Sequence, residues 1–135
     1  MEDLQYPGRW AAEAPDRPAI VMAESGEAMT FAELDAEANR ISRLFRSLGI
    51  QPGDHVAFCL ENRLEFLAVA WGAHYAGLYY TAISSRLTAD EIAYIVDDCG
   101  ARVFVTSPYK ADEVAEIAAA MPKVETRFAL GGPVK

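Results

Sequence analysis

The run Ser84-Ser85-Arg86 combines residue types and a position in the sequence that are suited to binding a ligand. It follows an apolar, β-rich run at residues 78–83 and precedes T-A-D-E at 88–91, a pattern typical of a helix start. Ligands of α/β proteins often bind where a strand ends and a helix begins, so a single arginine at this junction raises the question of a functional role. Arg86 is therefore the candidate binding residue of this sequence.

A plainer interpretation of Arg86 stays open beside this one. An isolated charge in a loop is most often solvated, or it ties down a helix end or a neighbouring carboxylate. From the residue pattern alone this plainer interpretation is favoured, and the binding interpretation stays open beside it.

The other residues that could do chemistry do not combine into a site. His55 and His74 are isolated, with no cysteine or carboxylate at ligand spacing, so no metal site is assigned. Cys59 and Cys99 stand singly in apolar segments, which indicates reduced, buried thiols of a cytoplasmic protein. Glycine-rich nucleotide loops and a serine nucleophile elbow are absent, so no catalytic residue is assigned.

The composition is that of one globular domain. The chain has 135 residues, of which 52% are hydrophobic and 24% are charged, so it can bury one core. Its net charge of −8 argues against a nucleic-acid partner, which would require clustered lysine and arginine. Residues 66–85 carry no formal charge and are long enough to span a bilayer, but Gly72, His74 and Gly77 interrupt them. A buried helix followed by a buried strand, and no transmembrane span, is the expectation.

Strands and helices alternate along the chain. A lead-in at 1–18 contains a short helical piece at 9–13, a hairpin is expected at 19–31, and a loop at 131–133 ends the chain. Capping patterns begin the three longer helices at Thr30, Asn62 and Thr88. The expected helices end near residues 48, 76, 99 and 121, the last beginning at 110, and the remaining strands are expected at 56–60, 78–83, 102–106 and 126–130. This order predicts a single α/β domain over residues 1–135, with a mostly parallel sheet and helices on both faces.

Six segments give the sequence a resemblance to a known family. They are P-D-R-P-A-I-V (15–21), M-T-F-A-E-L (29–34), L-G-I-Q-P-G-D-H-V-A (48–57), E-N-R-L-E-F (61–66), A-G (76–77) and S-R-L-T-A-D-E-I-A-Y-I-V-D-D-C-G-A-R-V (85–103). In this order and spacing they resemble the start of an AMP-forming acyl-CoA synthetase. This adenylate-forming superfamily also holds luciferases and the adenylation domains of peptide synthetases.

The resemblance implies an N-terminal subdomain of a larger ligase. Such enzymes use ATP, Mg²⁺ and coenzyme A to convert a small-molecule carboxylic acid, such as a fatty acid, into an acyl-adenylate and then a thioester. The family's phosphate loop, its acidic ribose-binding segment and the lysine of its C-terminal lid are not found in these 135 residues. We therefore expect a truncated fold and an inactive isolated chain.

The resemblance also assigns a role to Arg86. In family members with arginine here, the side chain faces the nucleotide end of coenzyme A, so Arg86 is the expected cofactor-binding residue, helped by the free N–H groups of the next helix. Many members have a V-P-I-N-x-R-L run, whereas this chain has Y-T-A-I-S-S-R-L at 80–87. That departure leaves the chain length of the acid open.

Two alternatives and one further expectation remain at this stage. The chain could be a free-standing α/β interaction module, or part of an adenylation domain that feeds a carrier protein instead of coenzyme A. Because the helix expected at 64–76 is apolar on nearly every side, we also expect a homo-oligomer.

Overall fold

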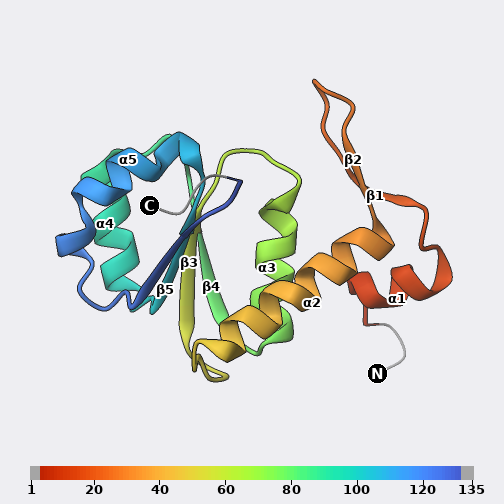
Figure 1. Cartoon of the computed structure of the whole chain (residues 1–135), viewed down its shortest axis with the longest axis horizontal. Helices are drawn as coiled ribbons and strands as arrows, with labels where there is room; N and C mark the ends of the chain where they lie inside the picture. The colour runs from red at the N-terminus through yellow and green to blue at the C-terminus, as the bar shows by residue number, and fades with distance from the viewer. Residues whose placement is uncertain (1–3, 132–135) are drawn as a thin grey trace. The chain divides into compact units, whose positions relative to one another are not determined.

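Residues 4–131 are described by a computed structural model and divide into two compact units (Figure 1). The first unit comprises the described part of Met1–Gly49 together with Arg63–Ala76, and the second comprises Ile50–Asn62 with the described part of Gly77–Lys135. The start of the expected lead-in, residues 1–3, and residues 132–133 of the expected final loop lie outside the described residues.

The first unit contains three helices and a hairpin. Its elements are α1 (Pro7–Glu13), β1 (Pro18–Val21), β2 (Ala28–Thr30), α2 (Phe31–Ser47) and α3 (Glu65–Tyr75). Strands β1 and β2 pair antiparallel, with Ile20 opposite Met29, so the predicted hairpin is confirmed.

Helix α2 begins with the predicted capping box. The Glu33 N–H donates to Thr30 Oγ1 over 3.1 Å, and the Thr30 N–H donates to Glu33 Oε1 over 3.4 Å. A cap of this kind typically stabilises a helix by about 1 kcal/mol. Leu34, Ala38 and Phe45 recur at helical spacing and are buried, so they form the inward face of α2.

The capping box predicted at Asn62 is wrong. Helix α3 has Leu64 at its N-cap, in helical backbone conformation and without a side-chain cap. Arg63 pairs with Glu65 over 2.9 Å, so the carboxylate that would complete the box is engaged by the guanidinium next to it. This hydrogen bond lowers the pKa of Glu65 below its ordinary value.

Close packing of α2 on α3 depends on Gly72. A Cβ atom added at Gly72 would lie 2.5 Å from Ile41 Cγ2 and 3.2 Å from the Ala38 carbonyl oxygen. The Tyr75 hydroxyl adds a polar tie to the same unit, since it donates to Asp35 Oδ1 over 2.8 Å and accepts from the Gly8 N–H over 3.1 Å. Burial, followed by the hydrogen bond to Asp35, raises the pKa of Tyr75.

The second unit is a parallel sheet with helices. Its elements are β3 (His55–Cys59), β4 (Tyr79–Ile83), α4 (Ala89–Asp98), β5 (Val103–Thr106), α5 (Pro108–Glu116), the 3₁₀ turn η1 (Ala118–Ala120) and β6 (Thr126–Ala129). The four strands lie in the order β4-β3-β5-β6, and every pair is parallel. The predicted parallel α/β fold is therefore confirmed.

The helix predicted at 110–121 differs from the observed one at both ends. Helix α5 begins at Pro108, because proline at the first helical position needs no N–H partner and has a helical φ angle. It ends at Glu116, and the chain tightens into η1 before Met121. Pro122 follows, and a proline disfavours helical conformation in the residue before it.

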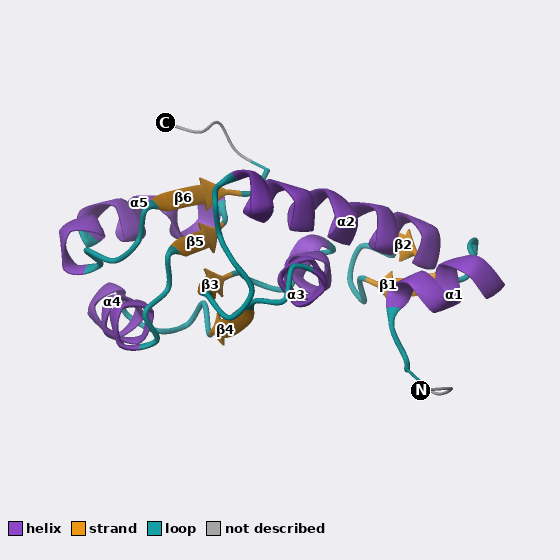
Figure 2. Cartoon of the chain, turned by 90° about the horizontal axis from the view of Figure 1, so that it is seen from below, coloured by secondary structure: helices purple, strands orange, loops and turns teal. Residues whose placement is uncertain are grey.

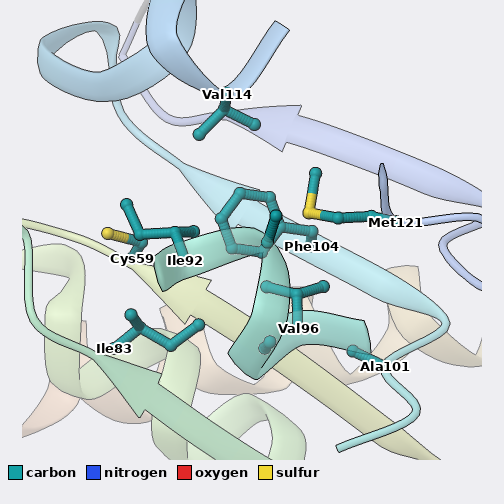
Figure 3. Close-up of a cluster of buried hydrophobic side chains, with 10 residues drawn as sticks. Cys59, Ile83, Ile92, Val96, Ala101, Phe104, Val114 and Met121 are labelled. Carbon is teal, nitrogen blue, oxygen red and sulfur yellow. The ribbon is translucent and has the colours of Figure 1, made fainter. Parts of the chain in front are cut away.

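Helices α4 and α5 cover the same face of the sheet (Figure 2). Ile92 and Val96 from α4 and Val114 from α5 pack with sheet residues, including the fully buried Phe104 at the centre (Figure 3). The cluster contains Ala57, Cys59, Ile83, Ile92, Ala93, Val96, Ala101, Phe104, Val114 and Met121. Burial of these side chains holds α4 on the sheet, and with it the loop between β4 and α4.

The uncharged stretch at 66–85 folds into a helix, a turn and a strand, as expected. The expectation of a buried strand is wrong, because β4 lies at the edge of the described sheet and exposes Tyr79, Tyr80 and Ala82. Within residues 4–131 no helix is both long enough and apolar enough to cross a membrane. Gly77 forms the turn with a φ of +76°, a backbone conformation that other residues rarely adopt.

An arginine joins three strands at the amino end of the sheet. Arg102 Nη1 lies 2.6 Å from Asp54 Oδ2, and Arg102 Nη2 lies 2.9 Å from Glu125 Oε2. The Gln51 N–H donates to the same Asp54 carboxylate over 2.8 Å. This backbone hydrogen bond, together with Arg102, lowers the pKa of Asp54 below its ordinary value of 3.8.

The Gly72→Ala substitution is expected to destabilise the first unit. Alanine has the higher helix propensity by about 1 kcal/mol, but overpacking against Ile41 costs roughly 1–3 kcal/mol. Urea denaturation should therefore show a lower free energy of unfolding. Adding Ile41→Ala removes the nearest clashing atom, Cγ2, but keeps Cβ at 2.7 Å. The double variant should therefore recover part of the loss and be more stable than the sum of the two single effects. Stabilisation by Gly72→Ala alone would show that the close packing is not present.

The Asp54→Asn substitution should remove a pH-dependent contribution to stability. Because the folded-state pKa of Asp54 is lowered, its contribution is present above pH 3.8 and is lost as the pH falls through the folded value. Thermal unfolding should give a lower Tm for the variant at pH 7, and the two curves should converge in acid below pH 3.8. Asp98→Asn, at an exposed position on α4, is the control. A Tm difference that is independent of pH would contradict the assignment.

Candidate functional site

The carboxyl ends of the parallel strands bring three loops to one edge of the sheet. These loops begin after β3, β4 and β5, at residues 60–62, 84–88 and 107. The strand order reverses at β3, because β4 lies on one side of it and β5 and β6 lie on the other. Such a reversal is where open α/β sheets bind ligands, so this edge is the candidate site.

Arg86 lies in the loop after β4, as predicted, and it is exposed. Its backbone N–H donates to Ser84 Oγ over 3.3 Å. The Arg86 guanidinium forms no hydrogen bond or ion pair with any residue between 4 and 131. The interpretation in which Arg86 ties down a helix end or a carboxylate therefore has no contact to support it. The exposed side chain agrees both with a solvated arginine and with a ligand-binding one.

The residues on both sides of Arg86 are held in place. The Leu87 N–H donates to the Ser84 carbonyl over 3.3 Å, and the Cys59 thiol donates to the same carbonyl over 3.7 Å. The Leu87 side chain is half-buried against the core cluster of α4 and α5. Thr88 then begins α4 with the predicted capping box. The guanidinium is thus a free charged group on a well-anchored backbone.

The start of α4 is less suited to an anion than the sequence suggested. The Thr88 N–H donates to Glu91 Oε2 over 2.8 Å, and Asp90 also lies in the first turn. Two carboxylates at this position complement the helix dipole themselves and would repel a phosphate. The expected help from the N–H groups of this helix is therefore weakened, and Arg86 stays a prediction for the binding of an anion.

Two polar residues at the same edge were missed by the sequence analysis. Ser107 directly follows β5, is fully buried and donates its hydroxyl hydrogen to Glu61, which follows β3. Thr106 Oγ1 donates to the Cys59 carbonyl over 3.1 Å. The signal was a polar residue at or shortly after the ends of β3 and β5, but its meaning depends on these two strands being neighbours. These contacts join the ends of β3 and β5, whereas Arg86 in the loop after β4 is exposed.

The two cysteines differ in exposure. Cys59 is buried, as predicted, and burial raises the pKa of its thiol, with a smaller opposite effect from Lys110. Cys99 is only half-buried, because it follows the last turn of α4, so the expectation of a buried thiol is wrong for this residue. Both thiols are free.

The histidines have aromatic neighbours. His55 stacks on Tyr79 with ring centroids 5.3 Å apart, and His74 meets the Trp71 ring edge-on at 5.2 Å. In the part of the chain that the structure describes, no three His, Cys, Asp or Glu side chains lie close enough together to hold a metal ion.

Comparison of the sequence with known proteins identifies a family model and several relatives that match most of the chain. A family model described as AMP-binding enzyme matches residues 8–132. Human long-chain fatty acid transport protein 1 is 36% identical over 117 residues, which cover 87% of this chain and 18% of the human protein. Long-chain-fatty-acid–CoA ligase FadD13 of Mycobacterium tuberculosis is 35% identical over 95 residues, which cover 70% of this chain and 19% of that ligase.

The fold agrees with a solved structure of the same group. The inhibitor-bound N-terminal domain of FACL13 from Mycobacterium tuberculosis superposes with a TM-score of 0.84 and 29% sequence identity, covering 91% of this chain and 32% of that one. The chain thus spans 18% and 19% of the length of the two curated relatives.

The two thiols should differ in reactivity. Thiolate is the reactive form, and the pKa of Cys59 is raised above its ordinary value of 9.0, so this buried thiol should react slowly with a disulfide reagent at pH 8. Cys99 should be modified first, and Cys99→Ser should leave only the slow phase. Unfolding the chain in urea should make both thiols react. Rapid modification of Cys59 in the folded chain would contradict its burial.

Proposed function

Because this chain belongs to the AMP-binding enzyme family, we propose that it is the N-terminal part of an ATP-dependent acyl-CoA synthetase. The observation that carries the proposal is the family match over residues 8–132, supported by relatives whose names describe long-chain fatty acid CoA ligation and transport. The acid is accordingly a fatty acid or a related carboxylic acid.

The reaction has two steps. A carboxylate oxygen of the acid attacks the α-phosphorus of ATP, the bond to the β-phosphate oxygen breaks, and pyrophosphate leaves. The sulfur of coenzyme A then attacks the acyl carbon, the thiol gives up its proton, and AMP leaves with the electron pair of the broken bond. Mg²⁺ and hydrogen-bond donors are required in the first step, because the carboxylate and the phosphates repel each other.

In this proposal, the residues at the described edge of the sheet help to bind coenzyme A and do not catalyse either step. The described edge of the sheet presents one unpaired guanidinium, and the other polar groups discussed above bond to one another. We propose that Arg86 contacts a phosphate of coenzyme A, because an arginine can donate two parallel hydrogen bonds to a phosphate group. The segments that hold ATP and Mg²⁺ belong, in this proposal, to the remainder of the ligase.

Location and assembly are further parts of the proposal. An enzyme that uses ATP and coenzyme A would work in the cytoplasm, which agrees with two free cysteines. Leu67 on α3 is 43% exposed although its neighbours Ala68, Val69 and Ala70 are buried. Exposed apolar residues of this kind agree with self-association into a homo-oligomer.

Replacing Arg86 by alanine in the full-length ligase should separate the two half-reactions. Loss of one charge-assisted contact costs about 1.5–3 kcal/mol, so the apparent KM for coenzyme A should rise roughly tenfold or more. The adenylation half-reaction, measured by ATP–pyrophosphate exchange, should be almost unchanged, because ATP and the acid bind elsewhere. Thioester formation at varied coenzyme A concentration is the second measurement.

The controls identify the group that Arg86 contacts. Arg43→Ala, at an exposed position on α2, should leave both half-reactions unchanged. With 3′-dephospho-coenzyme A the wild type and Arg86→Ala should converge if the 3′-phosphate is the contact. Equal losses in both half-reactions, or a lower Tm with unchanged kinetics, would refute the binding role. A wild-type ligase that forms no acyl-CoA would refute the proposed function itself.

A further inference from the structure

We propose that Lys110, on α5, is a positioning residue for the coenzyme A site because it holds the loop 84–88 from which Arg86 projects. This inference rests on the proposed function of Arg86. No feature of the sequence pattern pointed to Lys110, which falls in an ordinary stretch of helix. The structure instead places it beside a loop that lies 23 residues earlier in the chain.

The contacts of the lysine side chain define the role. Lys110 Nζ donates to the Leu87 carbonyl over 3.3 Å and lies 3.0 Å from Glu113 Oε2. The contact to Leu87 joins the residue directly after Arg86 to the start of α5, which follows β5. The ammonium thus connects the loop after β4 to the helix after β5.

Burial makes the presence of a lysine here informative. Lys110 is only 8% exposed, whereas a lysine normally keeps its charged group in water. Burying an ammonium is unfavourable unless hydrogen bonds and an opposite charge compensate it. Glu113 supplies the charge one turn away on α5, and the Leu87 carbonyl supplies an acceptor. An ion pair with Glu113 alone could form on the helix surface, so it is the Leu87 carbonyl that explains why the amine points inward.

Lys110 acts through the loop and is not itself a ligand of the anion. Its amine is already bonded to Leu87 and Glu113, and the neighbouring carboxylate neutralises its charge. Arg86, by contrast, is exposed and has no side-chain partner among residues 4–131. The two cations therefore have different tasks: Arg86 contacts the phosphate, and Lys110 fixes the backbone from which Arg86 extends.

The other anchors of the loop show what Lys110 adds. The Ser84 carbonyl accepts from Cys59 and from the Leu87 N–H, and the Thr88 capping box starts α4. These contacts fix the two ends of the loop against β3 and α4. The Leu87 side chain packs on the core cluster, and its carbonyl is held by Lys110. Without the lysine, the peptide bond that follows Leu87 loses its restraint from α5, and the direction of Arg86 is less well defined.

The experiment uses the full-length ligase with Lys110→Met, Lys110→Arg and, as a matched control, Lys123→Met. Lys123 is an exposed lysine that donates to the Asp97 carbonyl over 2.9 Å, at the far end of α4. Lys110→Met should raise the apparent KM for coenzyme A roughly threefold to tenfold, because a donor to the loop is lost. Lys110→Arg should recover part of this loss, and Lys123→Met should change nothing. ATP–pyrophosphate exchange should stay at the wild-type level in all three.

A double-mutant cycle tests whether Lys110 acts through Arg86. In the Arg86→Ala background, Lys110→Met should cause no further rise in KM, since there is no guanidinium left to position. Full additivity, or an equal loss in both half-reactions, would overturn the inference and assign Lys110 to general stability. Lys110→Gln replaces Lys110→Met in the cycle if the methionine variant does not fold.

The outcomes separate this inference from the proposed function. If Arg86→Ala raises the KM for coenzyme A and the Lys110 variants do not, the positioning role fails and the proposed function stands. If Arg86→Ala leaves that KM unchanged, the role of Arg86 fails, and the role of Lys110 fails with it.

Discussion

The candidate site depends on the burial of α4 against the parallel sheet. Ile92 and Val96 of this helix pack on Phe104 at the centre of the sheet, and all three are fully buried. Removing large apolar side chains from water is the main favourable contribution to folding, and it fixes where α4 begins. The loop between β4 and α4 has only five residues, 84–88, so its path follows from the positions of these two elements. A loop with both ends fixed in this way can hold one charged side chain in a defined place.

Polar contacts at this edge of the sheet distinguish Arg86 from its polar neighbours, whose side chains are hydrogen-bonded. Glu61 and Ser107 bond to each other between the ends of β3 and β5, and Lys110 bonds to the loop and to Glu113. Ser107 and Lys110 are buried and Glu61 is partly buried, so leaving any of these three groups without its partner would be costly, whereas Glu113 is exposed. Arg86 is exposed, so it needs no partner for stability and can exchange water for a ligand at little cost. An exposed guanidinium on an anchored loop agrees with the proposed binding of an anion.

Short sequence patterns predicted most of the helices and strands, because each pattern depends on residues that are close together in the chain. The capping boxes at Thr30 and Thr88 formed because each involves residues three apart, whose geometry is set within one helical turn. The apolar run at 78–83 gave a strand of the parallel sheet for the same kind of reason. The capping box predicted at Asn62 failed because Arg63 pairs with Glu65 instead. The pattern specified only Asn62 and Glu65, so it took no account of the arginine between these two positions. The expectation of a buried Cys99 failed because a helix end exposes residues that a mid-helix position would cover.

The sequence by itself determined the α/β class, the expectation of a parallel sheet and the position of Arg86 between a strand and a helix. Propensity, periodicity and capping act over a few neighbouring residues, so these features can be read locally. The family resemblance came from the order and spacing of six short segments. Only the tertiary structure decided that the Arg86 side chain has no partner among residues 4–131, that Glu91 and Asp90 make the start of α4 less favourable for an anion, and that Lys110 holds the Leu87 carbonyl. These facts depend on which strands are neighbours in the sheet. Contacts such as that between Lys110 and Leu87 join residues far apart in the chain, and the order of strands that brings them together is set by how the whole core packs.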